Sequence, residues 1–297
     1  MSFKCPFPNR SCFLKFLENL RPYVERKVRE MLSLSQALEK ESFPEEPLTL
    51  IVKAIVTQSW RFKGSWKRFV ETMKERSYDK WHTKSKEVKC QQTDSVEVEP
   101  LIGLEDLSCV CEVLLYLHKR TGKEPWRDKA KAVEALEEKL RSSGSLRLWV
   151  SELYKAIPEG FLYGEKPECL KGVKGIGLKG ACDIVRTLGY FDVAPIDIHE
   201  KRFLLRTGIV CRYGPASFDP RDEISYLIAL RNFCREELSG EKILGIDLGE
   251  APGIVDVAIW CFCSEEEEGM NICGNEPSCD ECPLCSCCLY YFLTHPV

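Results

Sequence analysis

The sequence predicts an all-α protein, and three observations support this fold class. Apolar residues recur at steps of three and four along several segments, which is the period of a helix with one buried face. Of the 297 residues, 44% are hydrophobic and 30% are charged, so the chain can bury a core and is unlike a disordered protein. We find no internal repeat of the length typical of solenoid proteins.

The expected helices follow this period in order along the chain. Apolar positions at helical spacing fill four segments: residues 13–32, 50–55, 132–140 and 227–234. Pro44 and Pro47 separate the first two segments, since proline interrupts a helix. Residues 82–105 are polar and lack a period, so we expect an inserted loop there, with a short strand at 96–98.

Composition and charge indicate a protein without a membrane partner. The formal net charge is -4, and no apolar run approaches the roughly 20 residues of a membrane-spanning helix. The N-terminus lacks the apolar stretch of a signal peptide, so we expect a soluble, cytoplasmic protein. Asparagine and glutamine are scarce, at five and four residues, and with the high charge this favours a thermophilic source. We expect that source to be a prokaryote, a thermophilic archaeon.

Cysteine is unusually frequent in this chain. There are 17, an odd number, so a fully paired disulfide framework is excluded and a reducing compartment is expected. Four of them form a C-x5-C-x2-C-x5-C pattern near the C-terminus: Cys273, Cys279, Cys282 and Cys288. Four thiolates at such spacing hold a tetrahedral metal ion or a [4Fe–4S] cluster. Because Cys285 and Cys287 lie close by, the last ligand stays open among these two and Cys288.

The region from Lys53 to Lys89 differs from the rest of the chain in charge. It holds eleven basic and four acidic residues, a local charge of +7, and aromatic residues interleave with the basic ones: Trp60, Phe62, Trp66 and Phe69. A surface that binds a polyanion fits this pattern, and so does a solvated helix face with its aromatic residues turned inward.

The most informative segment begins with Gly175-Ile176-Gly177, a predicted tight turn between two helical stretches. The glycines leave backbone amides exposed at the start of the second helix, where the helix dipole favours a phosphate. Ile176 would anchor the turn in the core. Most turns of this kind only connect helices, and these three residues alone do not decide between the two interpretations.

Lys179 follows the turn by two residues, and Asp197 follows Lys179 by 18, within Pro-Ile-Asp-Ile-His. This arrangement resembles the helix-hairpin-helix DNA glycosylases, of which endonuclease III is the familiar member, although Lys174 stands where that family often has proline. The passage from Gly189 to His199 is also similar to archaeal 8-oxoguanine glycosylases.

The resemblance implies a chemistry for Lys179 and Asp197. A neutral lysine amine attacks C1′ of the sugar and expels the base, and the resulting Schiff base permits β-elimination of the 3′ phosphate. A nearby carboxylate stabilises the positive charge that develops on the sugar. The residues by themselves also allow a solvated lysine at a helix start and an aspartate that only caps the next helix. We interpret His199 as a structural hydrogen-bonding residue.

Two further segments match the family. The cysteine pattern is similar to the iron–sulfur loop of endonuclease III, with five residues in its first spacing where that family commonly has six. The resemblance therefore implies a [4Fe–4S] cluster, with zinc as the alternative. The helix that ends near Gln58 resembles the one whose glutamine fills the gap left by an extruded base, and the alternative is an ordinary surface glutamine. The DNA contacts implied by the resemblance come from Gln58, Gly175, Ile176 and Gly177.

The resemblance also implies two helical lobes with the active cleft between them. Residues 46–188 would form a barrel lobe that ends in the hairpin, and residues 1–45 with 189–297 would form the cluster-bearing lobe. We expect a monomeric DNA glycosylase with AP-lyase activity on double-stranded DNA that contains a damaged or mismatched base. The alternatives are a glycosylase for mismatched uracil or thymine that uses water, and a non-enzymatic DNA-binding iron–sulfur protein.

Overall fold

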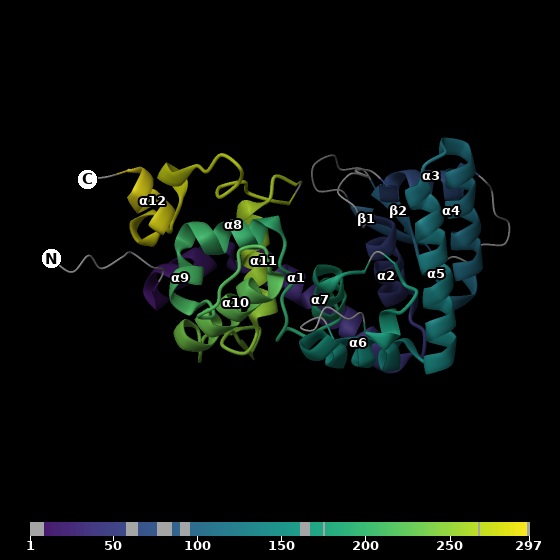
Figure 1. Cartoon of the computed structure of the whole chain (residues 1–297), viewed down its shortest axis with the longest axis horizontal. Coiled ribbons are helices and arrows are strands. Elements are labelled where there is room, and N and C mark those ends of the chain that lie inside the picture. Colours follow the sequence, from purple (N-terminus) through teal and green to yellow (C-terminus); the bar gives the residue numbers. More distant parts are fainter. Residues whose placement is uncertain are drawn as a thin grey trace. The chain divides into compact units, whose positions relative to one another are not determined.

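The computed structural model describes residues 9–57, 65–75, 85–89, 96–160, 167–174, 176–266 and 268–295. Within these residues the chain is mainly helical (Figure 1), and the predicted all-α class is confirmed. Backbone contacts divide the chain into two compact units: unit 1 is Met1–Leu32 with Gly189–Val297, and unit 2 is Ser33–Leu188. The sequence prediction divided it at 45/46 and 188/189. The first boundary lies instead between Leu32 and Ser33, within helix α1 (Arg10–Lys40). The two ends of this one long helix belong to different units.

Unit 2 holds the hairpin segment at its C-terminal end. Helices α4 (Leu107–Thr121) and α5 (Glu124–Ser143) lie side by side in it (Figure 1). They are joined by a short turn at Gly122, whose φ of 64° is the left-handed conformation that glycine adopts without strain. The other helices are α2 (Glu45–Thr57), α3 (Ser65–Glu75), η2 (Leu104–Asp106), α6 (Leu146–Gly160), η4 (Glu168–Leu170) and α7 (Leu178–Thr187).

The segment expected to be an inserted loop contains a two-stranded antiparallel sheet. Strand β2 (Val96–Pro100) confirms the strand predicted at 96–98. It pairs with β1 (Ser85–Lys89), and Val98 lies opposite Glu87. The prediction missed β1 because its sequence, Ser-Lys-Glu-Val-Lys, carries a single apolar residue and so shows no alternating pattern.

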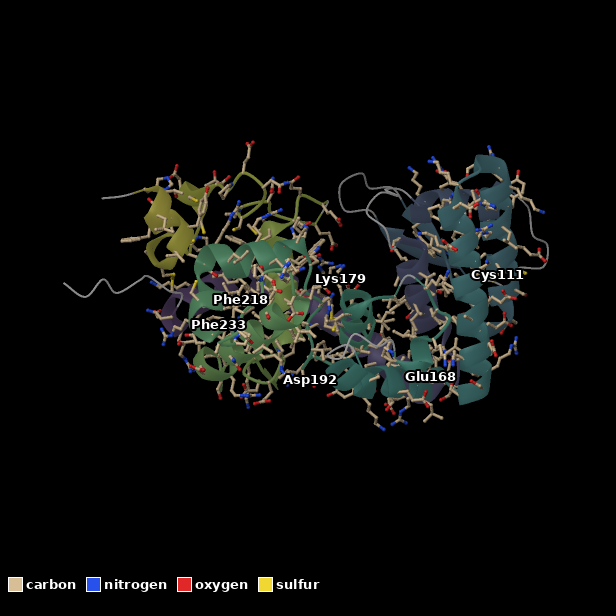
Figure 2. The ribbon with its side chains drawn as sticks, viewed as in Figure 1. Cys111, Glu168, Lys179, Asp192, Phe218 and Phe233 are labelled. Atoms are coloured by element: carbon tan, nitrogen blue, oxygen red, sulfur yellow. A yellow bond between two sulfur atoms is a disulfide. The ribbon has the colours of Figure 1, made fainter. Side chains whose placement is uncertain are left out.

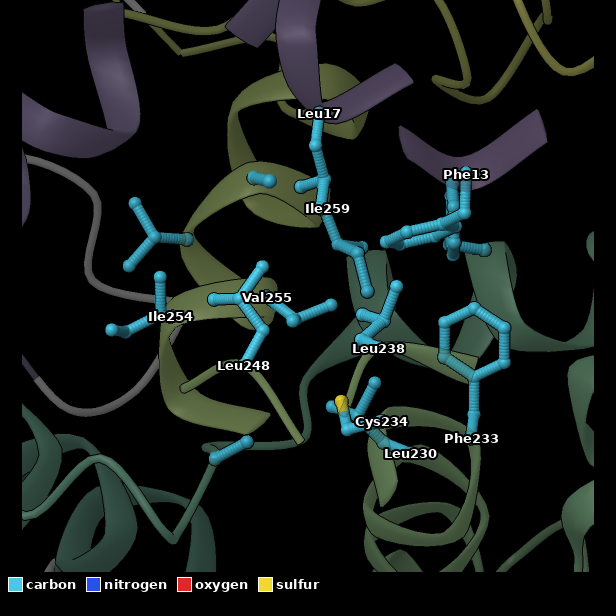
Figure 3. Packing of buried hydrophobic residues seen from close by; sticks show 14 of the residues in the cluster. Phe13, Leu17, Leu230, Phe233, Cys234, Leu238, Leu248, Ile254, Val255 and Ile259 are labelled. Carbon is cyan, nitrogen blue, oxygen red and sulfur yellow. The ribbon is translucent and has the colours of Figure 1, made fainter. Parts of the chain in front are cut away.

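Unit 1 is built around the N-terminal half of α1. Phe13 and Phe16 of this helix are fully buried, and the ring of Phe13 lies 4.7 Å from that of Phe233 (Figure 3). The other elements of unit 1 are α8 (Ile198–Thr207), α9 (Ile209–Tyr213), α10 (Glu223–Glu237), β3 (Lys242–Ile243), β4 (Ile246–Asp247), α11 (Pro252–Cys263), η5 (Cys279–Glu281), η6 (Cys285–Cys287) and α12 (Leu289–Thr294).

The most apolar of these helices, α11, is a core helix of unit 1. It has 12 residues, and all but Trp260 are buried. Among the described residues, no helix has both the length and the apolar character needed to cross a bilayer.

One disulfide joins the two ends of unit 1. It connects Cys12 in α1 with Cys287 in η6, across a sequence separation of 275 residues. The expectation of a reducing compartment took no account of such a bond, which intracellular proteins of hyperthermophiles do carry. Because Cys287 is bonded to Cys12, it is removed from the possible metal ligands.

Candidate active site

The hairpin is anchored in unit 2 by its apolar residues. Ile176 is 1% exposed, as the anchoring prediction requires, and Val173, three positions earlier, is fully buried. The turn before it is the 3-10 helix η4, which is held to α6 by a hydrogen bond of 3.1 Å from the Trp149 indole nitrogen to the Cys169 backbone oxygen. Gly175 lies outside the described residues. Burial therefore fixes the path of the chain into α7.

Gly177 is the residue before α7, and the fold does not require a glycine there. Its φ of -96° is open to any residue, and among the described residues no atom beyond the adjacent residues lies within 4 Å of the position that a Cβ would occupy. The residue is exposed. What glycine provides at this position is an uncovered backbone at the start of a helix, where N–H groups lack partners in the helix.

Lys179 lies in the first turn of α7, in unit 2 (Figure 2). Its side chain is exposed. The positive end of the helix dipole disfavours the ammonium form of a lysine at this position. Exposure to water favours the ammonium form of a lysine.

Asp197 is the N-cap of α8, in unit 1, which confirms the predicted capping role. Its carboxylate accepts a hydrogen bond of 2.6 Å from the backbone N–H of His199. Its own backbone N–H donates to Oε2 of Glu200, at 2.9 Å. These reciprocal bonds form a capping box and hold the aspartate at the helix start.

His199 and Glu200 follow Asp197 in the first turn of α8, and the hydrogen-bonding role of the His199 ring stays a prediction. The backbone of His199 is hydrogen-bonded as described above, whereas its ring Nδ1 is buried and has no hydrogen-bond partner among the described residues. Glu200 is a site residue that the prediction missed, and its side chain is 1% exposed. Burial first, then the charge of Asp256 and a hydrogen bond with the Asp197 side chain, raise the pKa of Glu200 well above its ordinary value.

The two predicted catalytic residues belong to different units, Lys179 to unit 2 and Asp197 to unit 1. The predicted cleft between two lobes stays a prediction, as do the catalytic roles of both residues.

The four predicted cysteine ligands all lie in unit 1, after α11. Cys279 begins η5, Cys282 follows it directly, and Cys288 precedes α12. Burial raises the pKa of Cys282 to about 12, and the charges of Cys273, Cys288 and Cys279 act in the same direction. Among the described residues, however, no three His, Cys, Asp or Glu side chains converge in a geometry able to hold a metal ion. The four thiols are therefore the right chemical ligands for a cluster, but their arrangement in this structure does not form a site for one.

Two residues that the prediction did not include, Cys263 and Arg206, lie next to Cys273. A hydrogen bond with the Cys263 thiol and the nearby Arg206 guanidinium lower the pKa of Cys273 to about 6, although burial opposes this shift. Nη1 of Arg206 lies 3.7 Å from the Cys273 sulfur. A thiol with a lowered pKa is closer to the thiolate form that binds metals. The high density of cysteines from 261 onward was the only signal of Cys263 in the sequence.

The basic region keeps both of its interpretations. Gln58, Trp60 and Phe62 lie outside the described residues, so the predicted DNA contact of Gln58 stays untested. Phe69 is fully buried, and Trp66 stacks on it with the ring centres 5.3 Å apart. These two aromatic residues are thus turned inward, while the basic side chains beside them are exposed.

Comparison with known proteins finds relatives that are named as DNA glycosylases. No family model matches the chain. Over 93 residues it is 32% identical to the 8-oxoguanine DNA glycosylase/AP lyase of Saccharolobus islandicus, and 33% identical to that of Saccharolobus solfataricus. Each match covers 31% of this chain and 40% of the relative, so the chain matches about two fifths of the length of these relatives.

A solved structure, that of the 8-oxoguanine DNA glycosylase Tm1821 of Thermotoga maritima, aligns over 83% of this chain and 91% of its own. The TM-score is 0.45 and the sequence identity 20%. The match over 93 residues confirms the resemblance to the helix-hairpin-helix DNA glycosylases.

Proposed function

We propose that this protein is a base-excision DNA glycosylase with AP-lyase activity, and that its substrate is 8-oxoguanine in double-stranded DNA. One observation carries the proposal: Lys179 stands in the first turn of the helix that follows the glycine hairpin, and Asp197 caps the next helix at the family spacing. The lesion comes from the relatives, which are named 8-oxoguanine DNA glycosylase/AP lyase.

In the proposed reaction, the damaged nucleotide leaves the base stack before any bond is broken. This step costs a few kcal/mol and is cheapest at a damaged or mismatched pair. The exposed amides at Gly177 and the start of α7 would hold a backbone phosphate. DNA that covers Lys179 would supply the desolvation that its exposed side chain lacks.

The neutral amine of Lys179 then attacks C1′ of the sugar, and the bond from C1′ to the base breaks. The base leaves with the electron pair of that bond and takes up a proton. Loss of a proton from nitrogen and opening of the sugar ring give a Schiff base, which draws electrons and permits removal of a C2′ proton with departure of the 3′ phosphate. The Asp197 carboxylate stabilises the positive charge that develops on the sugar ring.

Reduction of the Schiff base tests the role of Lys179. Borohydride added to the protein with an 8-oxoguanine duplex should trap a covalent adduct in the wild type and none in Lys179→Gln. The matched control is Lys174→Gln, which removes another exposed lysine of the same hairpin. An adduct of undiminished yield in Lys179→Gln would remove the lyase mechanism. Base release without strand cleavage by the wild type would favour a glycosylase that uses water.

The role of Asp197 can be separated from helix capping. Asn also caps helices, so Asp197→Asn should keep the stability of α8 while base release slows by about 10²-fold or more. Asp222 is the N-cap of α10 and accepts hydrogen bonds from Ile224 and Ser225, so Asp222→Asn is the same change at a helix without a proposed catalytic role. Equal rates for the two variants would reduce Asp197 to a capping residue.

A panel of duplexes tests the proposed lesion. Each duplex carries one lesion: 8-oxoguanine, an oxidised pyrimidine, uracil opposite guanine, or thymine opposite guanine. Fastest release of 8-oxoguanine under single-turnover conditions is expected. Tight binding of every duplex without release from any would favour the non-enzymatic DNA-binding protein. Gel filtration on the same preparation tests the proposed monomer.

We further propose that Cys273, Cys279, Cys282 and Cys288 hold a [4Fe–4S] cluster that shapes the C-terminal segment of unit 1. The support is an all-thiol donor set at the spacing of such clusters, together with the lowered pKa of Cys273. When bound, the cluster would supply a structural cross-link and take no part in base removal. Iron and sulfide analysis of anaerobically purified protein tests this assignment, and stoichiometric zinc instead of iron would refute it. Cys285→Ser should keep the iron that Cys288→Ser loses.

A further inference from the structure

Three acidic side chains gather at the start of α8, all of them within unit 1. Glu200 lies in the first turn and is 1% exposed, while Asp197, the N-cap, is half-buried. Asp256 is 2% exposed and comes from α11, the helix that packs against α8. A buried carboxylate is stable in its ionised form only when donors or positive charges compensate for the lost water.

The hydrogen-bond donors that reach Glu200 account for one of its two oxygens. Oε2 accepts the backbone N–H of Asp197, at 2.9 Å. Oε1 is buried and meets no hydrogen-bond donor among the described residues. An ionised carboxylate needs donors at both oxygens, whereas a carboxylic acid can instead donate its own proton to an acceptor. The orphaned oxygen therefore suits the protonated form.

Among the described residues, the groups whose charges act most strongly on the Glu200 carboxyl are themselves acidic. Its principal electrostatic neighbours are two carboxyl groups, those of Asp197 and Asp256, and its charge in turn acts on the Cys263 thiol of α11. The nearest arginine along α8, Arg202, donates instead to the side-chain oxygen of Asn275 at 2.6 Å. Neighbouring carboxyl groups such as those of Glu200 and Asp197 share a proton, because ionising both has a large free-energy cost.

We propose that Glu200 is a positioning residue for Asp197: it is a neutral carboxylic acid whose O–H donates to the Asp197 carboxylate while its other oxygen accepts the Asp197 backbone N–H. The aspartate is thereby held at both its backbone and its side chain. It also stays the ionised member of the pair, which is the form that can stabilise a positive sugar. This inference rests on the proposed function, in which Asp197 meets the sugar. Burial and the neighbouring carboxylates also raise the pKa of Glu200, as the neutral form requires.

The proton on Glu200 can be observed without DNA. Infrared spectra of the free protein, with the glutamate carboxyl carbons isotopically labelled, should show at pH 7 the carbonyl stretch of one protonated acid. The band should vanish in Glu200→Gln. If the wild type shows no protonated glutamate at pH 7, the proposal is wrong, whatever the enzyme does. Because the wild-type spectrum alone decides this question, the proposal can be tested even if a variant fails to fold.

The positioning role is tested by the acid limb of the pH–rate profile for base release. Gln has nearly the same shape as the acid and can make both hydrogen bonds, so Glu200→Gln should keep the rate within about threefold and leave the acid limb in place. Glu200→Met removes both bonds. It should slow base release at least tenfold and move the acid limb to higher pH, because the Asp197 carboxylate loses a donor that favours its ionised form.

The matched control is Glu223→Met, the same change in the first turn of α10, where the side chain pairs with Lys201 instead of the N-cap. It should leave the acid limb unchanged. Equal pH profiles for the wild type and Glu200→Met would overturn the positioning role. A wild type that releases no base would instead overturn the proposed function, and the infrared result would still decide the state of Glu200.

Discussion

Arg206 donates a hydrogen bond of 2.6 Å to the backbone oxygen of Gly274, the residue after Cys273. The same guanidinium reaches the backbone oxygens of Cys273 and Asn275, at 3.3 and 3.0 Å. In return, the Cys288 thiol donates to the Arg206 backbone oxygen at 3.3 Å. Helix α8 thus has Asp197 at its N-terminal end, and near its C-terminal end it contacts both the first and the last predicted cysteine ligand.

Removing the Arg206 side chain should weaken metal binding. Arg206→Met keeps apolar contact with the Tyr290 ring, over which the guanidinium lies, but loses the bonds that hold the segment around Cys273. Loss of such supporting groups typically lowers metal affinity about 10–100-fold. Iron per chain after dialysis against a chelator measures the effect. Arg235→Met, at an exposed position in α10, is the control and should retain wild-type iron.

A methyl group at Gly177 should affect DNA binding and leave the fold intact. The backbone there is open to alanine and no atom stands in the way, so the free energy of unfolding of Gly177→Ala should stay within about 1 kcal/mol of the wild type. The methyl group would partly cover the amides proposed to hold a phosphate, so DNA should bind less tightly. Ile176→Ala is the reverse case and should destabilise unit 2 by about 2–5 kcal/mol. DNA affinity equal to that of the wild type in Gly177→Ala would count against the phosphate site.

Lys129 should make the stability of unit 2 rise with pH. Its amine, buried in α5, hydrogen-bonds to the Val56 backbone oxygen, and burial lowers its pKa from 10.5 to about 8. Between these two values the unfolded chain binds more protons than the folded one, so this residue adds stability as pH rises from 8 to 10.5. Buried thiols act in the opposite direction. The measurement is therefore the difference in unfolding free energy between the wild type and Lys129→Met. A difference that stays constant over this range would contradict the lowered pKa.

Reduction of the disulfide should destabilise unit 1. The Cys12–Cys287 bond restricts the unfolded chain, and its loss typically costs about 2–4 kcal/mol. Thermal unfolding with and without a reductant measures the loss in the wild type. Cys12→Ser should unfold at the lower temperature in both conditions. A wild-type transition that is insensitive to reductant would show that the bond does not form in solution.

Local features of this protein could be predicted from the sequence. The helical class follows from apolar spacing, as at Phe13 and Phe16, and Ile176 is buried as its place between two glycines suggests. The cap at Asp197 could be predicted because capping depends on residues within one turn. In each case the determining interactions lie within a few positions along the chain.

Features that depend on distant pairing could not be predicted. Asp197 and Glu200 show a capping-box spacing, but the burial of Glu200 depends on α11, more than 50 positions further along the chain. The pairing of Cys12 with Cys287 is likewise one among many that 17 cysteines allow. Strand β1 forms only because β2 supplies its partners. Such contacts are set by the tertiary fold and leave no periodic signal.

The division of unit 1 between the two ends of the chain has a consequence for synthesis. The ribosome releases Ser33–Leu188 as one uninterrupted stretch, so unit 2 can close its core while translation continues. Phe13 and Phe16 leave the ribosome before this stretch, yet they must wait for α10 and α11, which emerge after it. Until then these apolar side chains of α1 stay exposed, and a ribosome that stalls after Leu188 would display a folded unit 2 together with an apolar helix segment that a chaperone could bind.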